Sequence, residues 1–232
     1  MKTIVVLPTY NEAENIEELI TTILKTYSDF EILIIDDGSP DGTGPIVSRL
    51  SRQYSNVHLM QRSRKLGLAS AYQEGFTWAL QREFDYIVQM DADFSHDPKH
   101  ISAMLERAKA GVGLVIGSRY NDGAMIKDWF LLRAFVSRIA NLYARSILRL
   151  KIYDLTGGFR CFRADTLREI DLSSIRSKGY AFQIEMAYLC RKRQRSVEEI
   201  PIVFSERRQG RSKFSLQCII EAFFLVLRLA IG

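Results

Sequence analysis

The sequence predicts an α/β fold in which a mostly parallel central sheet carries helices on both faces. Three observations support this prediction. Short apolar runs alternate with helical patterns through the first half of the chain, 47% of the 232 residues are hydrophobic, and polar side chains follow most of the apolar runs. Alternating strands and helices form parallel sheets, and ligands bind beyond the carboxyl ends of their strands. The polar residues at the ends of the apolar runs therefore indicate where function lies.

The elements follow from residue periodicity. Five apolar runs have the length and composition of buried strands, at 3–7, 31–35, 57–60, 86–90 and 113–117, and helical patterns cover about 13–26, 43–54, 68–82 and 98–110. Asn11 and Asp97, the latter followed by Pro98, are the expected starts of the first and last of these helices. In the less regular second half we expect helices near 129–149, 181–193 and 213–231, strands at 159–163 and 197–204, and a turn at Gly157-Gly158.

Charge is distributed unevenly along the chain. Residues 1–122 hold 12 Lys and Arg against 17 Asp and Glu, whereas residues 123–232 hold 20 against 10. This asymmetry indicates an anionic partner for the second half, either nucleic acid or anionic lipid, unless it only reflects solvated helix faces. The three cysteines are widely spaced and form no CxxC pair. Together with a first segment that is typical of a buried strand and not of a signal peptide, they favour a chain in, or facing, the cytoplasm.

Asp91 and Asp93 follow the predicted strand 86–90 and flank Ala92. Alternation along a strand directs both carboxylates to one side. Hard divalent ions prefer oxygen ligands, and Mg²⁺ takes one or two carboxylates and completes its shell with water and substrate phosphate. This position therefore predicts a metal that neutralises a nucleoside diphosphate leaving group. The alternative is a pair of solvated loop aspartates.

A second acidic pair, Asp36-Asp37, follows the predicted strand 31–35. We expect Asp37 to bind a base or a ribose hydroxyl, as acidic residues at this place do in dinucleotide-binding folds. The stretch Ser39-Pro40-Asp41-Gly42 is expected to make the following turn. Glu12 either lines the same site or is an ordinary first-turn helix acid.

Several spaced motifs carry a family resemblance. PTYNE at 8–12, DDGSPDGT at 36–43, KLGLASAY at 65–72, MDADFSHDP at 90–98 and IGSRY at 116–120 resemble the family 2 inverting glycosyltransferases of GT-A fold. DLTGGFRCFR at 154–163 and FSERRQGRSK at 204–213 narrow the resemblance to the polyprenol (dolichol) phosphate mannose synthases. The resemblance covers nearly the whole chain. It implies an enzyme that moves mannose from GDP-mannose to a polyprenyl or dolichyl monophosphate, with Mg²⁺ or Mn²⁺ as cofactor.

The resemblance also implies roles for individual residues. Asp91, Asp93 and Arg119 would be catalytic, and Asp91, Asp93 and Ser95 would hold the metal, with Ser95 at a position where some relatives have Gln. The acceptor phosphate would contact Arg119, Arg133 and Ser137. The donor nucleotide sugar would contact Pro8, Tyr10, Glu12, Ile35, Asp37, Asp91, Ala92, Asp93, Arg119, Arg207 and Lys213.

Two segments of the second half have the pattern of helices that lie in a membrane interface. Residues 129–149 hold four arginines and no acidic residue, and residues 213–231 are largely apolar apart from Gln217, Glu221 and Arg228. The second segment is too short and too interrupted to span a bilayer. Ordinary packing on the catalytic domain is the alternative for both. We expect a catalytic domain over 1–212, including the interfacial helix near 129–149, and an amphipathic membrane-associating helix over 213–232.

We therefore expect a peripheral protein at the cytoplasmic face of a membrane, where it could bind a membrane-protein partner. Three rival interpretations remain. The same fold could use a UDP-sugar such as UDP-glucose, or a protein, glycan or undecaprenyl acceptor. A scaffold without activity could dock a membrane partner. A nucleic-acid-binding module requires aromatic and basic side chains interleaved on an exposed surface, whereas the aromatic residues here recur at helical core spacing, so we expect no nucleic-acid partner.

Overall fold

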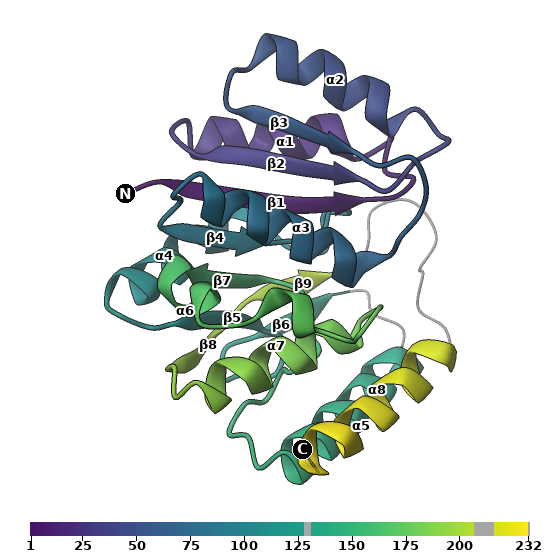
Figure 1. Cartoon of the computed structure of the whole chain (residues 1–232), viewed down its shortest axis with the longest axis vertical. Helices are drawn as coiled ribbons and strands as arrows, with labels where there is room; N and C mark the ends of the chain where they lie inside the picture. Colours follow the sequence, from purple (N-terminus) through teal and green to yellow (C-terminus); the bar gives the residue numbers. More distant parts are fainter. Residues whose placement is uncertain (128–130, 207–215, 232) are drawn as a thin grey trace.

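A seven-stranded sheet forms the centre of the chain (Figure 1). The computed structural model describes residues 1–127, 131–206 and 216–231, and only the backbone of residues 131–133 and 216. The strands of this sheet are β1 (Thr3–Thr9), β2 (Glu31–Asp36), β3 (Val57–Gln61), β4 (Tyr86–Gln89), β5 (Leu114–Ser118), β7 (Arg160–Arg163) and β8 (Val197–Pro201). Their order is β3-β2-β1-β4-β7-β5-β8. Every neighbouring pair is parallel except the two made by β7, so the predicted mostly parallel sheet is confirmed.

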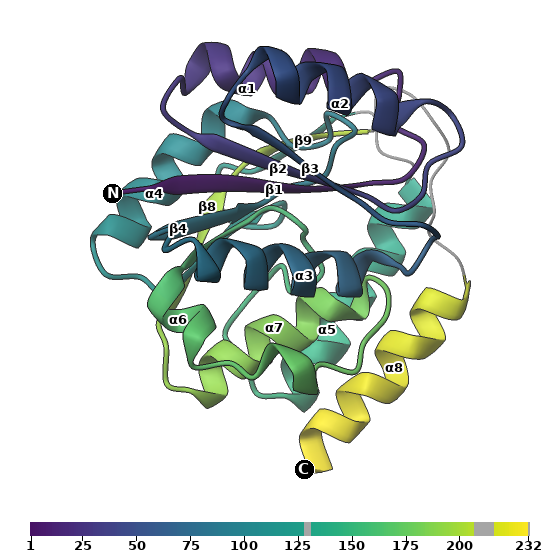
Figure 2. The same cartoon turned by 45° about the horizontal axis from the view of Figure 1, so that its top comes forward.

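Helices cover both faces of this sheet, as predicted (Figure 2). One face carries α1 (Ile16–Thr26), α2 (Thr43–Gln53) and α4 (Ile101–Lys109), and the other carries α3 (Leu68–Gln81), α6 (Ala164–Arg168) and α7 (Ala181–Lys192). The strand period of two explains both layers. In β1, Ile4 and Val6 join the core under α3 and α7, whereas Val5 and Leu7 join the core under α1 and α2. Each fully buried side chain of this size contributes about 1.5–3 kcal/mol, so both layers are held firmly.

The first helix begins later than the sequence suggested. It starts at Ile16, and Asn11 instead has a φ of 57°. The reason is that the backbone N–H groups expected to start the helix are used elsewhere. Asn11 N donates to Ser39 Oγ at 2.9 Å, and Ala13 N donates to Asp41 Oδ2 at 2.9 Å. The prediction that Asn11 caps the helix was wrong, because residues 11–13 are tied to the neighbouring loop.

The predicted single strand at 197–204 is two strands. After β8 the chain leaves the main sheet, and β9 (Val203–Ser205) pairs in parallel with β6 (Met125–Lys127), a strand the sequence did not suggest. Pro201 ends β8, and proline has no backbone N–H with which to continue a ladder. Two short 3-10 helices, η1 (Pro98–His100) and η2 (Leu172–Ser174), precede α4 and α7 along the chain. The Asp97 side chain accepts a hydrogen bond from Lys99 N, as expected of a helix start.

Two further helices lie side by side at the edge of the molecule where the parallel strands end (Figure 1). They are α5 (Leu131–Ile147) and α8 (Leu216–Ile231). The Tyr143 ring of α5 stacks on the Phe223 ring of α8 with 5.2 Å between centroids, and Tyr143 OH donates to Phe223 O at 3.2 Å. Within the described ranges, no helix has both the length and the apolar character needed to cross a membrane.

Candidate functional site

A cavity of about 710 Å³ lies beyond the carboxyl ends of the parallel strands. One end of it is polar and the other is apolar. The polar end is lined by residues near or after the ends of β1, β4 and β5, together with Ser137 and Thr156. The full set is Pro8, Glu12, Asp91, Ala92, Asp93, Ser95, His96, Arg119, Ser137 and Thr156. The apolar end lies between α5 and α8 and is lined by Phe135, Ile139, Tyr143, Ile219, Phe223 and Val226, among others. The cavity is therefore amphipathic along its length.

The structure brings most of the expected site residues together. Eight of them line this cavity: Pro8, Glu12, Asp91, Ala92, Asp93, Ser95, Arg119 and Ser137. Tyr10, Ile35 and Asp37 are not among the lining residues. Arg207 and Lys213 lie outside the described residues, as does the side chain of Arg133, whose backbone belongs to α5.

Asp91 and Asp93 reach the cavity through a turn and not through strand alternation. β4 ends at Gln89, before the expected end of the strand, and Ala92 lines the cavity together with the two aspartates. Asp93 Oδ1 accepts a hydrogen bond from Ser95 N at 3.0 Å, and Phe94 has a φ of 62°. The predicted neighbourhood of the two carboxylates is confirmed, but the alternation argument for it was wrong.

His96 completes this turn, a part that we did not predict from the sequence. Its Nδ1 accepts a hydrogen bond from Asp91 N at 3.2 Å, and its ring stacks on Phe159 with 5.0 Å between centroids. Burial lowers the pKa of His96 to about 4, although the nearby Asp93 carboxylate acts in the opposite direction. The imidazole is therefore neutral at pH 7 and adds no positive charge next to the two aspartates.

Arg119, which lines the polar end, is held by the buried carboxylate of Asp154. Its Nε donates to Asp154 Oδ2 at 2.7 Å and its Nη2 donates to Asp154 Oδ1 at 2.6 Å, a two-pronged pair. Burial acts to lower the pKa of Arg119, but the Asp154 carboxylate outweighs burial and raises it. Arg119 Nη2 also donates to Thr156 Oγ1 at 2.8 Å, and this hydroxyl lies 3.3 Å from Ser137 Oγ. The expected neighbours Arg119 and Ser137 are thus joined through Thr156.

The loop that carries Asp154 and Thr156 is itself held on several sides. Asn141 Oδ1 accepts from Leu155 N at 2.7 Å, and Glu199 Oε1 accepts from Asp154 N at 2.8 Å. The fully buried Arg160 donates to three carbonyl oxygens, those of Leu155 at 2.8 Å, Gly157 at 2.9 Å and Gln183 at 2.6 Å. Burial lowers the pKa of Arg160 to about 10, so the guanidinium is still charged at pH 7.

The same loop packs against the acidic turn at Gly158. A Cβ placed on Gly158 would lie 3.3 Å from both carboxylate oxygens of Asp91. Such a distance is closer than most Cβ contacts, so a side chain here would displace the carboxylate. Glycine at this position therefore lets the loop pack closely against the Asp91 carboxylate.

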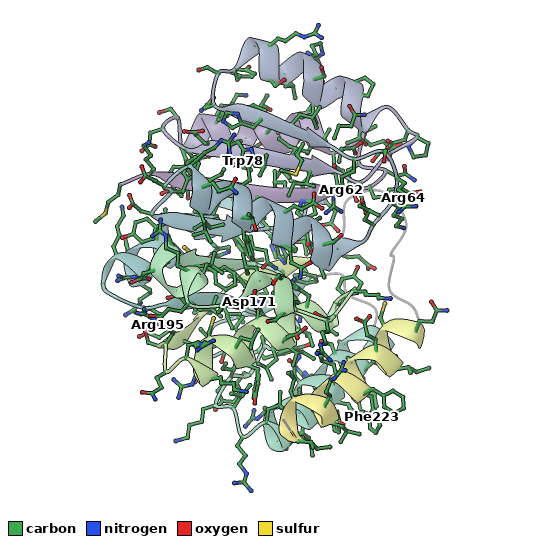
Figure 3. All side chains as sticks on the ribbon, viewed as in Figure 1. Arg62, Arg64, Trp78, Asp171, Arg195 and Phe223 are labelled. Atoms are coloured by element: carbon green, nitrogen blue, oxygen red, sulfur yellow. The ribbon has the colours of Figure 1, made fainter. Side chains whose placement is uncertain are left out.

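Asp37 is engaged by the loop that joins β3 to α3. Its Oδ1 accepts from Arg62 Nη1 at 3.0 Å and from Leu66 N at 2.8 Å, and its Oδ2 accepts from Gly67 N at 2.8 Å. Figure 3 shows Arg62 at the edge of the sheet where the parallel strands end. Asp37 therefore fixes the course of residues 62–67, and its contact with a nucleotide stays a prediction.

The neighbouring turn is made as expected. Asp41 Oδ1 accepts from Thr43 Oγ1 at 2.6 Å and from Thr43 N at 3.1 Å. Burial acts to raise the pKa of Asp41, but the hydrogen bonds from Thr43 and Ala13 outweigh it and lower the pKa. Asp36, for which no role was predicted, accepts from Ser39 N at 3.1 Å and so shares this task.

The polar end of the cavity has the chemistry of a site for a hard cation. Asp91, Asp93 and Ser95 offer carboxylate and hydroxyl oxygens, the ligands that Mg²⁺ and Mn²⁺ prefer. Over residues 1–127, 131–206 and 216–231 there is no cluster of three or more His, Cys, Asp or Glu suited to a metal.

Comparisons with known proteins agree on one family. The family model described as "Glycosyl transferase family 2" matches residues 4–171. The chain is 43% identical over 226 residues to polyprenol monophosphomannose synthase of Mycolicibacterium smegmatis, which covers 97% of this chain and 85% of that protein. It is 40% identical over 228 residues to undecaprenyl-phosphate mannosyltransferase of Micrococcus luteus, covering 98% of this chain and 93% of that protein.

Among solved structures, the fold is similar to that of glucosyl-3-phosphoglycerate synthase from Mycobacterium tuberculosis. The structure of that enzyme in complex with Mn²⁺, UDP-glucose and phosphoglyceric acid matches with a TM-score of 0.72 at 16% sequence identity. The match covers 99% of this chain and 79% of that chain. At this level of identity the likeness establishes a common fold.

Proposed function

The chain belongs to glycosyl transferase family 2, and we propose that it transfers mannose from GDP-mannose to a polyprenyl (dolichyl) monophosphate, with inversion at the anomeric carbon. That it is a glycosyltransferase follows from the family and from the two mannosyltransferase relatives. The donor nucleotide, the stereochemistry and the assignment of individual residues are the proposal. They rest on the cavity and on the resemblance of the motifs.

The observation that carries the proposal is the amphipathic cavity. Its polar end holds the carboxylates of Glu12, Asp91 and Asp93 and the guanidinium of Arg119, and its other end continues between the apolar faces of α5 and α8. A polyprenyl phosphate has the same distribution of properties, with a charged head and a long apolar chain. We assign the phosphate to Arg119 and Ser137, together with Arg133, because hydrogen bonds between a guanidinium and a phosphate are strengthened by their opposite charges. The isoprenoid chain would then lie against α5 and α8.

The relatives support the choice of sugar and acceptor. Both are named for the transfer of mannose, one to a polyprenol phosphate and the other to undecaprenyl phosphate. GDP-mannose as the donor rests on the resemblance of the motifs alone. For the donor we retain Pro8, Tyr10, Glu12, Ile35 and Asp37 as nucleotide contacts, and Arg207 and Lys213 as phosphate contacts.

The proposed reaction is a single displacement. An oxygen of the lipid phosphate attacks the anomeric carbon, the bond from that carbon to the donor's diphosphate oxygen breaks, and the nucleoside diphosphate leaves with the electron pair. The second pKa of a phosphate monoester is about 6, so the nucleophile is already ionised at pH 7 and needs no general base. Arg119 orients the acceptor, and the neutral His96 holds the acidic turn through its hydrogen bond with Asp91 N and adds no positive charge there.

A divalent cation fits the donor set at the polar end. Asp91 and Asp93, with Ser95, would hold Mg²⁺ or Mn²⁺, and the ion when bound would neutralise negative charge on the leaving diphosphate. The related fold crystallised with Mn²⁺ and UDP-glucose is in keeping with this assignment.

The exposed surface of α5 and α8 supports a peripheral position on a membrane. Leu142 of α5 is 59% exposed and Phe224 of α8 is 63% exposed, although both are large and apolar. Large apolar side chains exposed on two neighbouring helices indicate an interaction site. We propose that α5 and the segment 213–232 rest in the membrane interface, at the cytoplasmic face, in keeping with three free cysteine thiols.

The test is a transfer assay with the purified protein. It combines a polyprenyl phosphate in detergent or vesicles, Mg²⁺ or Mn²⁺, and a panel of radiolabelled GDP- and UDP-sugars, and measures label in the lipid extract. We expect a mannolipid from GDP-mannose and loss of this product when EDTA is added. We also expect no product from Asp93→Ala, although this variant should melt at nearly the wild-type temperature. Preferential use of a UDP-sugar, or nucleotide-sugar turnover without lipid product, would refute the donor or the acceptor assignment.

A further inference from the structure

Helix α8 is attached to the catalytic domain through its only acidic residue. The described helix, Leu216–Ile231, contains one acid, Glu221, and one base, Arg228. Glu221 Oε1 accepts hydrogen bonds from Lys178 N at 2.6 Å and from Gly179 N at 3.2 Å. These two N–H groups directly precede α7, where a helix dipole also favours a carboxylate. The one negative charge of this largely apolar helix therefore lies against the segment that precedes α7.

The segment that Glu221 contacts is also bound to α3. The carbonyl oxygen of Lys178 accepts from Ala69 N, in the first turn of α3, at 3.2 Å. A Cβ on Gly67 would lie 3.3 Å from that same oxygen, so the two backbones are in close contact. Ser177 N donates to Glu185 Oε2 at 3.0 Å, which fixes the segment to α7. Residues 177–179 thus join α8 to the start of α3.

The start of α3 belongs to the donor side of the proposed site. Gly67 N and Leu66 N both donate to the Asp37 carboxylate at 2.8 Å. Hydrogen bonds therefore link Asp37 to the backbone of Gly67, Ala69, two residues further on, to Lys178, and Lys178 to Glu221. On α8, Cys218 and Ala222 flank Glu221 and line the apolar end of the cavity.

We propose that Glu221 is a positioning residue that couples the acceptor side of the cavity to the donor loop 62–67. This inference rests on the proposed function, because it assigns the lipid chain to the apolar end and the nucleotide to the loop. A lipid that fills the space against α8 favours the position of α8 in which Glu221 holds residues 178 and 179. These residues then support Gly67 in the position that Asp37 fixes. By linkage, the acceptor tightens donor binding and the donor tightens acceptor binding by the same factor.

The experiment measures the dissociation constant of GDP by calorimetry with Mn²⁺, in the presence and absence of farnesyl phosphate. For the wild type we expect the lipid phosphate to tighten GDP binding at least about fivefold, the lower range of typical coupling. Glu221→Ala should reduce the effect to less than about twofold, and Glu221→Gln should keep part of it because an amide oxygen still accepts a hydrogen bond. Gln217→Ala, an exposed position one turn earlier on the same helix, is the matched control and should behave as the wild type.

Steady-state kinetics separate positioning from loss of structure. In Glu221→Ala the KM for the donor should rise about fivefold, while kcat at saturating donor and acceptor stays within about twofold of the wild type. Circular dichroism and thermal melting establish that each variant is folded. If farnesyl phosphate tightens GDP binding as much in Glu221→Ala as in the wild type, or does not tighten it in the wild type, the role of Glu221 is refuted. The proposed function is unaffected by either result. A wild type that binds no nucleotide overturns the proposed function as well.

Discussion

Arg119 and Asp154 show how much of the site depends on a single buried pair. The Asp154 side chain is fully buried and lies against a guanidinium that is itself almost inaccessible. Neither charge is stable there without the other, because burial of an unpaired charge is costly. The pair also sets the direction of Arg119, whose remaining contacts lead to Thr156 and Ser137.

Substitution Asp154→Asn should therefore lower both activity and stability. We expect a loss of about 3 kcal/mol in the free energy of unfolding at pH 7, since a buried guanidinium is left unpaired, and a fall in transfer rate of about 100-fold. Denaturant unfolding and the lipid transfer assay measure the two effects. An Asn variant with wild-type stability would show that the pair contributes little.

The Arg119–Asp154 pair should also make the stability of the fold depend on pH. Burial acts to raise the pKa of Asp154, but the charge and hydrogen bonds of Arg119 outweigh it and lower the pKa. A carboxyl group whose pKa is lower in the folded state stabilises the fold above its ordinary pKa of about 4, and this contribution is lost as the pH falls below that value. Between pH 2 and 7, the free energy of unfolding should therefore change less with pH for Asp154→Asn than for the wild type. Denaturant unfolding at a series of pH values measures this difference.

Gly158 offers a substitution that disturbs the acidic turn without breaking a hydrogen bond. Gly158→Ala places a Cβ within 3.3 Å of the Asp91 carboxylate, which must move. We expect the Mn²⁺ concentration for half-maximal activity to rise about tenfold, while the melting temperature changes by only a few degrees. Metal titration of the transfer activity measures the effect. An unchanged metal requirement would argue against Asp91 as a ligand.

Several of these residues could be found from the sequence and several could not. Asp91, Asp93 and Arg119 stand next to strand ends, where the position along the chain already predicts a place in the site. Asp154 and Thr156 follow no strand, and their role depends on contact with Arg119, 35 and 37 residues away. His96 was passed over because a lone histidine gives no spacing signal. Asp37 lies outside the cavity lining because the loop 62–67 occupies its carboxylate.

At the level of elements, the helical pair α5 and α8 is the part of the fold with an unusual surface. The pair is tied together by the stacking of Tyr143 on Phe223, yet both helices leave large apolar side chains exposed. Periodicity predicted both helices to within a few residues, because a basic or polar stripe on an apolar helix is visible in one sequence. It could not show that the two helices pack on each other, since that contact joins distant segments.

The double substitution Leu142→Asp and Phe224→Asp tests this surface. Each side chain contributes about 1.5 kcal/mol or more when it enters an apolar phase, so the pair should weaken binding to anionic vesicles at least about 100-fold. Cosedimentation with vesicles measures the effect. Met125→Asp is the control, because Met125 is 53% exposed but lies on β6 and not on the helical pair. Equal vesicle binding by all three proteins would show that another surface docks.

At the level of the whole molecule, the predicted GT-A fold is confirmed by the family match and the structural neighbours. The first half of the chain was predicted most completely, because each of its first four strands is followed by its own helix and pairs with a neighbour in parallel. The second half was predicted less well. β7 is antiparallel, α6 follows it without a break, and β6 and β9 form a separate pair, all of which depend on partners far along the chain.

The place of β7 in the sheet has a consequence for biosynthesis. β7 lies between β4 and β5, although it follows both in the sequence. A nascent chain that has emerged only as far as residue 159 has therefore completed two strands whose facing edges have no partner. Unpaired strand edges recruit other strands, so this stage is the one most prone to aggregation. A pause in translation while Arg160 and the following residues are still inside the ribosome would lengthen this period, and a chaperone that shields strand edges would act during it.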